Sequence, residues 1–243
     1  YGTHPGGSKM HPITFLQSLF CVQHVKPCAP KPHMDALAHH PIDRKHPPTH
    51  SAPNPLDVVA PDLGRVKKVT KAAAAAHHYV GPNPLPLWVT EFWWETKPPD
   101  PNLGVPPQKQ AEYIEQALYL FWLQHVPVAI NLQMRDSKTV VGDSLATYQT
   151  GVYYYDDTKK PSYEAFRFPF VIDLSKHGKG LAWGRAPNSG KVAIERKSKG
   201  GWAAVGHASG TAGNVFTDTI QAKAGDVLRA TVGGEASVPW HVR

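Results

Sequence analysis

The chain has 243 residues, of which 41% are hydrophobic and 19% are charged, a balance typical of a folded globular protein and not of a disordered one. The formal net charge is +7, but the lysines and arginines are scattered along the chain and form no stripe, so we expect no nucleic-acid partner. The longest apolar candidate, residues 117–130, is interrupted by Gln124, His125 and Pro127, which excludes a membrane span of about 20 residues.

The first predicted elements are a short helix and a short strand. Residues 13–20 follow Pro12 and are mostly apolar, which favours a helix. Residues 34–39 form a short apolar run that ends in His39, with His40 and Pro41 directly after it. We expect this run to be a strand, because proline follows it within two residues.

A second helix and a second strand follow. Pro61 and Asp62 open a helix predicted to continue through His77, with Asp62 as the N-cap and apolar residues such as Leu63 and Val66 on one face. Residues 85–91 are then predicted to form the next strand.

The helix predicted most clearly is "PPQKQAEYIEQALYLFWLQHV". Its apolar residues recur at helical spacing, and they are Ala111, Ile114, Leu118, Phe121 and Trp122. Residues 127–134 follow as a strand that is apolar apart from Asn131 and Gln133. Near-continuous apolar strands alternating with helices indicate a parallel sheet covered by helices, as in an α/β barrel.

The pattern changes after residue 169. Short segments that often alternate apolar with polar residues are separated by glycine, asparagine and lysine turns, and they are residues 191–196, 202–206, 215–220 and 227–232. We therefore predict two domains, an α/β domain over residues 1–169 and a small antiparallel β-sandwich over residues 170–243.

The cysteines and histidines give only weak evidence for a disulfide or a metal site. Cys21 and Cys28 either close a short loop as a disulfide, which would favour an oxidising compartment, or remain two thiols. The fourteen histidines show no HExxH or similar ligand spacing. We therefore predict no metal site and no cofactor.

One carboxylate is in an unusual place. Glu91 ends the apolar run in "LWVTEFWW" and is followed by three aromatic residues. A buried and unpaired carboxylate would cost several kcal/mol, so Glu91 is exposed, paired or functional. The alternative without a function is that Glu91 caps the strand or lies where the chain leaves the strand for solvent.

The order of several motifs resembles a known enzyme group. The motifs are "HMDALAHHPI", "PDLGRVKKV", "PLWVTEFWWETKPPDP", "INLQMRD" and "GVYYYDDTKKPSYEAFRFPF". Over about residues 1–170 they resemble the second half of a TIM-barrel glycoside hydrolase of clan A, most similar to family 39-like and cellulase-like secreted bacterial proteins. The resemblance implies strands six to eight of a (β/α)8 barrel, an extracellular location, and hydrolysis of O-glycosidic bonds in β-linked saccharides with retention.

The resemblance also assigns site residues. Glu91 matches the catalytic nucleophile at the end of the seventh strand, where barrel enzymes place their chemistry. His39 and His40 end the preceding strand, where the family often supplies a histidine or tyrosine that contacts the nucleophile or the substrate. The alternative for one of the two is a bond to backbone groups at the strand end, and the sequence does not say which. Trp93 and Trp94 are candidates for stacking on a sugar, with core packing as the alternative.

The eighth strand departs from the family pattern. Many members carry a tryptophan where this chain has Asn131. Gln133 and Asp136 are the other polar candidates for substrate binding at this strand end, although the pair formed by Arg135 and Asp136 is of a kind that is more often structural.

The family places its acid/base in an Asn-Glu pair, and no such dipeptide occurs in this sequence. We therefore expect the first five strands to lie upstream of Tyr1 and the chain to be inactive alone. The alternative function is a non-catalytic carbohydrate-binding protein or degenerate barrel, in which Trp183, Trp202 and Trp240 of the β domain could bind sugar.

Overall fold

The computed structural model describes residues 10–22, 28–138, 148–175 and 178–243. The chain divides into two compact units. The parallel-sheet unit comprises residues 1–93 and 120–132, and the β-rich unit comprises residues 94–119 and 133–243. Across the described ranges, no helix combines the length and the apolar character that crossing a membrane would require.

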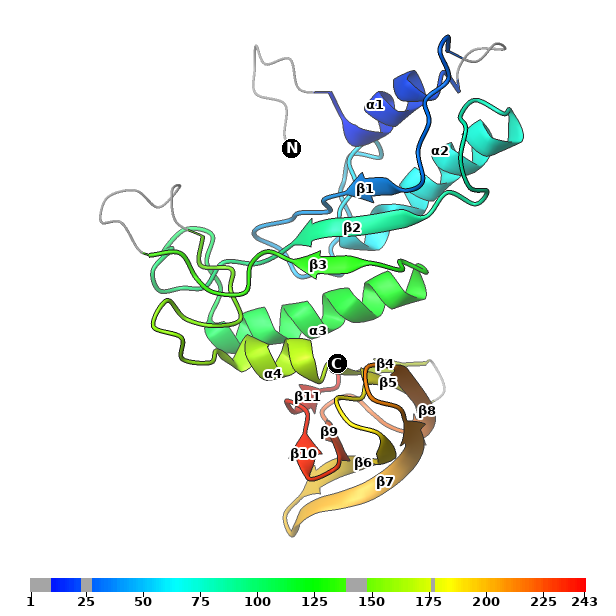
Figure 1. Cartoon of the computed structure of the whole chain (residues 1–243). Helices are drawn as coiled ribbons and strands as arrows, with labels where there is room; N and C mark the ends of the chain where they lie inside the picture. Colours follow the sequence, from blue (N-terminus) through cyan, green and yellow to red (C-terminus); the bar gives the residue numbers. More distant parts are fainter. Residues whose placement is uncertain (1–9, 23–27, 139–147, 176–177) are drawn as a thin grey trace. The chain divides into compact units, whose positions relative to one another are not determined.

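The parallel-sheet unit contains three strands in the order β1 (Leu37–His39), β2 (Leu87–Phe92) and β3 (Ala129–Asn131). All three run in the same direction (Figure 1), with Leu37 opposite Leu87 and Val89 opposite Ala129. The three strands predicted from the sequence are present, each shorter than expected, and the sheet is parallel as predicted. In a parallel sheet the carboxyl ends of neighbouring strands meet at one edge.

Two helices accompany this sheet. These are α1 (Pro12–Leu19) and α2 (Leu63–Ala75), which pack together, with a single 3-10 turn, η1 (Ala60–Asp62), before α2. Asp62 precedes α2 but makes no side-chain cap. Its carboxylate instead accepts the Ala52 amide at 2.8 Å and pairs with Arg65 at 3.0 Å, so the predicted capping bond is wrong.

The long helix α3 (Pro107–Leu123) confirms the strongest helical prediction, and its residues are divided between the two units. Ala111, Ile114 and Ala117 are fully buried, whereas Trp122 is 36% exposed. The apolar stripe is thus slightly rotated from the one that the sequence predicts.

The β-rich unit holds a short helix, α4 (Pro161–Arg167), and two antiparallel sheets. One sheet has the order β4 (Phe170–Leu174), β5 (Lys179–Arg185), β8 (Val215–Gln221). The other has the order β10 (Glu235–Ala236), β9 (Val227–Val232), β6 (Gly190–Ser198), β7 (Gly201–Gly210), with β11 (Trp240–His241) paired to β9. The four predicted segments are all strands, whereas β4, β5 and the two-residue strands β10 and β11 were not predicted.

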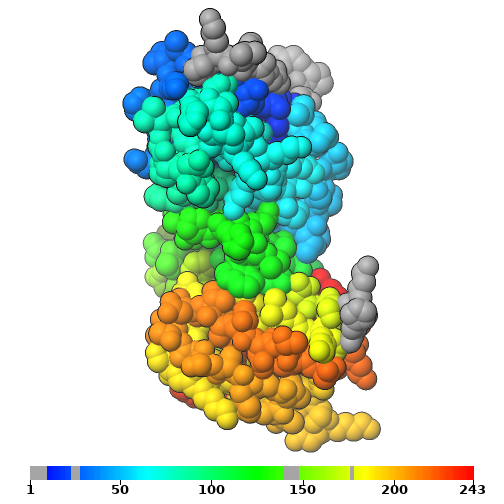
Figure 2. Space-filling view, turned by 90° about the vertical axis from the view of Figure 1, so that its right-hand side faces the viewer, coloured from blue at the N-terminus to red at the C-terminus, as the bar shows by residue number. Residues whose placement is uncertain are grey.

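The two sheets enclose an apolar core. Its fully buried members include Phe170, Val192, Ile194 and Leu228. Both sheets contribute to this core, because Phe170 lies in β4 and Val192 in β6, as in a β-sandwich. Figure 2 shows the outer surface of this unit, in which yellow and orange segments predominate.

Candidate active site

Glu91 lies near the carboxyl end of β2, the central strand of the parallel sheet, and its side chain is 25% exposed. Trp93 donates its indole N–H to Glu91 Oε1 at 2.8 Å. Nδ1 of His40 lies 3.4 Å from the other oxygen, Oε2. The carboxylate is thus partly buried, and each of its oxygens has a polar partner.

His40 reaches Glu91 because their two strands are neighbours. It directly follows β1, whose last residue, His39, lies opposite Val89 in the parallel register. The ring of His40 bridges two residues of β2, because Nε2 lies 3.0 Å from Thr90 Oγ1 while Nδ1 faces Glu91. The side chain of His40 is 42% exposed, so this edge of the site is open to solvent.

His39 has a different role. Its Nε2 lies 3.1 Å from the carbonyl oxygen of Val58, and burial lowers the pKa of its imidazole. The sequence left open which of the two histidines serves the backbone and which serves the carboxylate. The structure places His39 on the backbone and His40 beside Glu91.

The two tryptophans that follow Glu91 are both buried. Trp93 is 6% exposed, and the guanidinium of Arg44 lies 5.4 Å from its ring centre. Trp94 is 2% exposed and meets Tyr113 edge to face at 5.4 Å. The contribution of Trp93 to this site is therefore its N–H group and not an open ring face for a sugar, and we leave Trp94 out of the candidate site.

The polar residues predicted at the third strand have several roles. Asn131 ends β3 and is half-buried opposite Phe92. Gln133 donates to Ser137 Oγ and to the Tyr148 carbonyl oxygen, both at 3.1 Å.

Asp136 is a structural residue in this arrangement. It is 4% exposed and pairs with Nζ of the buried Lys160 at 2.7 Å. Burial raises the pKa of the Asp136 carboxyl and lowers that of the Lys160 ammonium. Arg135 does not pair with Asp136 but with Asp157, at 3.0 Å. The expected substrate role of Asp136 is thus replaced by a buried ion pair.

The cysteines are joined. Cys21 and Cys28 form a disulfide with 5.6 Å between their Cα atoms. Of the two arrangements that the sequence left open, the structure has the bonded one.

A cavity beside the site was missed by sequence reasoning. It has a volume of about 680 Å³ and is lined in part by His39, His40, Asp43, His46 and His50. Only the clustering of histidine and aspartate in the loop after β1 could have indicated it.

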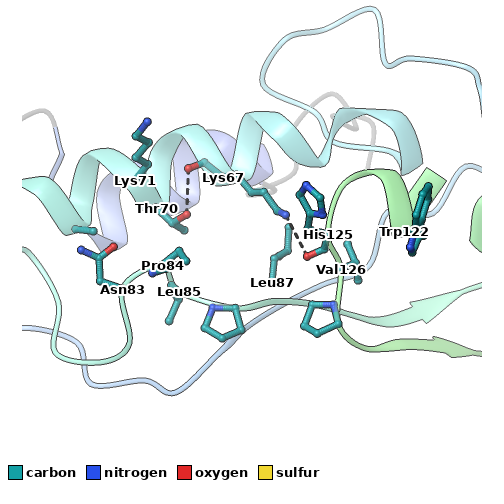
Figure 3. Close-up of a pocket in the computed structure, with 13 residues that line it drawn as sticks. Lys67, Thr70, Lys71, Asn83, Pro84, Leu85, Leu87, Trp122, His125 and Val126 are labelled. Atoms are coloured by element: carbon teal, nitrogen blue, oxygen red, sulfur yellow. Dashed lines mark hydrogen bonds between the residues drawn. The ribbon is translucent and has the colours of Figure 1, made fainter. Parts of the chain in front are cut away.

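A second cavity, of about 660 Å³, lies at the opposite ends of the strands. Figure 3 shows Leu85 and Leu87 at the beginning of β2, Val126 before β3, and Lys67 of α2 reaching across. Nζ of Lys67 donates to the carbonyl oxygens of Gln124 and His125, and burial lowers its pKa. Because α/β enzymes place their chemistry at the carboxyl ends of the strands, we place the candidate site at Glu91.

No family model matches the chain, and no curated protein matches it. Partial similarity is found to an FMN-binding beta-glucuronidase from Facaelibacterium prausnitzii L2-6, with 16% identity, 75% of this chain and 30% of that chain covered, and a TM-score of 0.34. A beta-D-mannosidase from Dictyoglomus thermophilum gives 13% identity, coverage of 56% and 19%, and a TM-score of 0.36. An endo-beta-1,4-mannanase from Thermotoga petrophila gives 12% identity, coverage of 86% and 48%, and a TM-score of 0.29.

The chain therefore spans less than half the length of each of these glycoside hydrolases. Because structural likeness at such low TM-scores does not establish a function, the assignment of a function to this chain depends on the geometry around Glu91.

Proposed function

We propose that this chain is the C-terminal part of the catalytic domain of a secreted, retaining glycoside hydrolase that acts on β-linked saccharides. The observation that carries the proposal is the position of the Glu91 carboxylate, at the carboxyl end of the central parallel strand and between Trp93 Nε1 and His40 Nδ1. A partly exposed carboxylate held in this way can meet a substrate without first being released from a buried ion pair.

In the proposed reaction, one Glu91 oxygen attacks the anomeric carbon and forms a glycosyl ester as the bond to the leaving-group oxygen breaks. A second carboxylic acid, about 5 to 5.5 Å from the first, protonates that oxygen. The same group then deprotonates a water molecule, which attacks the anomeric carbon and frees Glu91. The Asn-Glu pair that supplies this acid/base in the resembling family does not occur in the sequence, so the proposal assigns no residue of this chain to that role.

His40 and Trp93 are positioning residues in this proposal. The Trp93 N–H holds one oxygen of the Glu91 carboxylate. The contact between His40 Nε2 and Thr90 Oγ1 orients the imidazole ring, whose Nδ1 faces the other carboxylate oxygen. Holding the nucleophile in one orientation lowers the entropy cost of reaching the transition state.

The experiment uses the natural polypeptide that contains this chain. The protein is incubated with 2-deoxy-2-fluoro glycosides that carry a dinitrophenolate leaving group, which needs no acid catalyst, and the labelled peptide is located by mass spectrometry. We expect one sugar bound covalently to Glu91. Glu91→Gln should abolish labelling and lower hydrolysis by about 10⁴-fold or more, while Glu164→Gln, a change at a 41% exposed carboxylate, should leave both unchanged.

Covalent labelling of another residue, or normal turnover by Glu91→Gln, would refute the proposal. If the natural polypeptide binds saccharides without hydrolysing or being labelled by any of them, the carbohydrate-binding alternative is correct.

A further inference from the structure

Three side chains converge in the loop that follows β1. Nδ1 of His46 lies 2.9 Å from Oδ1 and 3.0 Å from Oδ2 of Asp43. Nδ1 of His50 lies 2.9 Å from Oδ2 of the same carboxylate. The rings of His46 and His50 stack with centres 4.0 Å apart and planes 23° from parallel, so both direct the same nitrogen towards one aspartate.

These separations suit ligands of a single ion. The donor atoms of Asp43, His46 and His50 all lie within 4.8 Å of one another. Metal-to-ligand distances of about 2.0 to 2.2 Å place neighbouring ligand atoms roughly 3 to 3.5 Å apart in tetrahedral or octahedral geometry. The separations between nitrogen and oxygen already fall close to this range, so only small side-chain movements are needed.

We infer that Asp43, His46 and His50 form a binding site for a divalent transition-metal ion of the zinc type, with two imidazole nitrogens and one carboxylate oxygen as ligands. Imidazole favours zinc, copper, nickel or iron, whereas magnesium and calcium prefer sites made only of oxygen. Three protein ligands leave at least one coordination position open.

The surrounding loop fixes the aspartate. The amides of Lys45 and His46 donate to Asp43 Oδ1 at 3.2 and 3.3 Å, and the His50 amide donates to the Pro47 carbonyl at 2.9 Å. Backbone bonds of this kind orient metal ligands before the ion arrives.

The cluster faces the cavity of about 680 Å³ that His39 and His40 also line. An ion bound there would have solvent access on the cavity side through its open position. The neighbouring residue Arg44 is also a cation, but its guanidinium lies over the Trp93 ring. Its positive charge therefore interacts with that ring, which is not part of the cluster.

The sequence contains the spacing His-x3-His at His46 and His50, but Pro47 and Pro48 lie between them. On a helix such a pair shares one face, whereas two successive prolines exclude a helix here. The expectation of no metal site overlooked this pair of histidines, which the loop brings together without a helix.

Isothermal titration with zinc chloride tests the site, using the natural polypeptide without an affinity tag and after removal of metals by chelation. Asp43→Asn, His46→Gln and His50→Gln should each weaken the same single zinc equivalent by about tenfold or more. His207→Gln and His241→Gln, at exposed histidines of the β-rich unit, are the matched controls and should bind as the unaltered protein does. Circular dichroism checks that each variant is folded.

A measurement on the unaltered protein keeps the test valid if a variant fails to fold. Zinc should protect His46 and His50 from modification by diethyl pyrocarbonate and leave His207 and His241 reactive. Equal modification of all four with and without zinc, or titrations identical for the three ligand variants and the controls, would overturn the inference. Glu91→Gln should keep the zinc equivalent, so this inference and the proposed hydrolase can fail separately.

Discussion

At the scale of single residues, Glu91 shows how a charge can end an apolar strand. Both of its oxygens have a polar partner, one from its own strand end and one from the neighbouring strand. These contacts lower the cost of partial burial and leave 25% of the side chain exposed to solvent.

Trp93→Phe should impair catalysis in the natural polypeptide without unfolding it. Phenylalanine keeps an aromatic ring at this buried position but removes the N–H that Glu91 Oε1 accepts at 2.8 Å. A hydrogen bond to a charged group contributes about 1.5 to 3 kcal/mol, so kcat should fall about 10- to 100-fold while KM changes little.

Steady-state kinetics check this prediction, and Trp88→Phe is the control. Trp88 lies in the same strand, is 40% exposed, and is separated by two residues from Glu91. Equal losses in the two variants would show that the Trp93 N–H has no special role.

At the scale of elements, a buried ammonium group joins segments of the β-rich unit. Nζ of Lys160 donates to Thr96 Oγ1 at 3.1 Å, to Asp136 at 2.7 Å and to the Gln149 carbonyl oxygen at 3.1 Å. Its three donors are all used, which is what a fully buried ammonium requires.

Lys160→Met should lower the free energy of unfolding by about 3 to 5 kcal/mol, because it leaves the Asp136 carboxylate buried without its cation. Adding Asp136→Asn should restore part of the loss, because no charge then remains buried. Urea unfolding followed by circular dichroism measures both variants. If Lys160→Met alone proved as stable as the unaltered protein, the buried pair of Lys160 and Asp136 would not stabilise the fold.

A second ion pair joins α4 to β10. Hydrogen bonds from Arg167 and Asn188 lower the pKa of Glu235 from its usual 4.5 to about 2. Because the pKa in the folded state is below that of the unfolded state, the stabilisation is complete above about pH 4.5 and is lost as the pH falls towards 2.

Glu235→Gln should therefore lower the melting temperature at pH 7 and have a smaller effect near pH 2.5. Thermal melts of both proteins across this range give the comparison. A difference in melting temperature that stays constant with pH would mean that the Glu235 charge does not stabilise the fold.

At the scale of the whole molecule, the two compact units have separate buried residues. Val66 of α2 belongs to the parallel-sheet unit and Ile194 of β6 to the β-rich unit, and both are fully buried. Chains with several units commonly unfold in more than one step.

Ile194→Ala should cost about 2 to 5 kcal/mol through the cavity it leaves, and it should shift the calorimetric transition of the β-rich unit. Val66→Ala should shift the other transition. The control is Lys197→Ala, at an exposed position of the same strand as Ile194, which should change stability by less than about 0.5 kcal/mol. A single transition that both core variants move equally would contradict two separate units.

The sequence by itself determined the local features. Apolar runs and helical spacing indicated β1, β2, β3 and α3, and their uninterrupted character indicated a parallel sheet. The end of the apolar run also placed Glu91 at the carboxyl end of a strand. The domain boundary at residue 169 stays a prediction.

The tertiary structure alone decided the partners. Periodicity along the chain carries no information on which side chains meet across tens of residues. It therefore could not show that His40 faces Glu91 while His39 bonds the backbone of Val58. Nor could it show that Asp136 pairs with Lys160, or that two histidines lie beside Asp43. Those choices depend on strand register and loop path, which arise only when the whole chain packs.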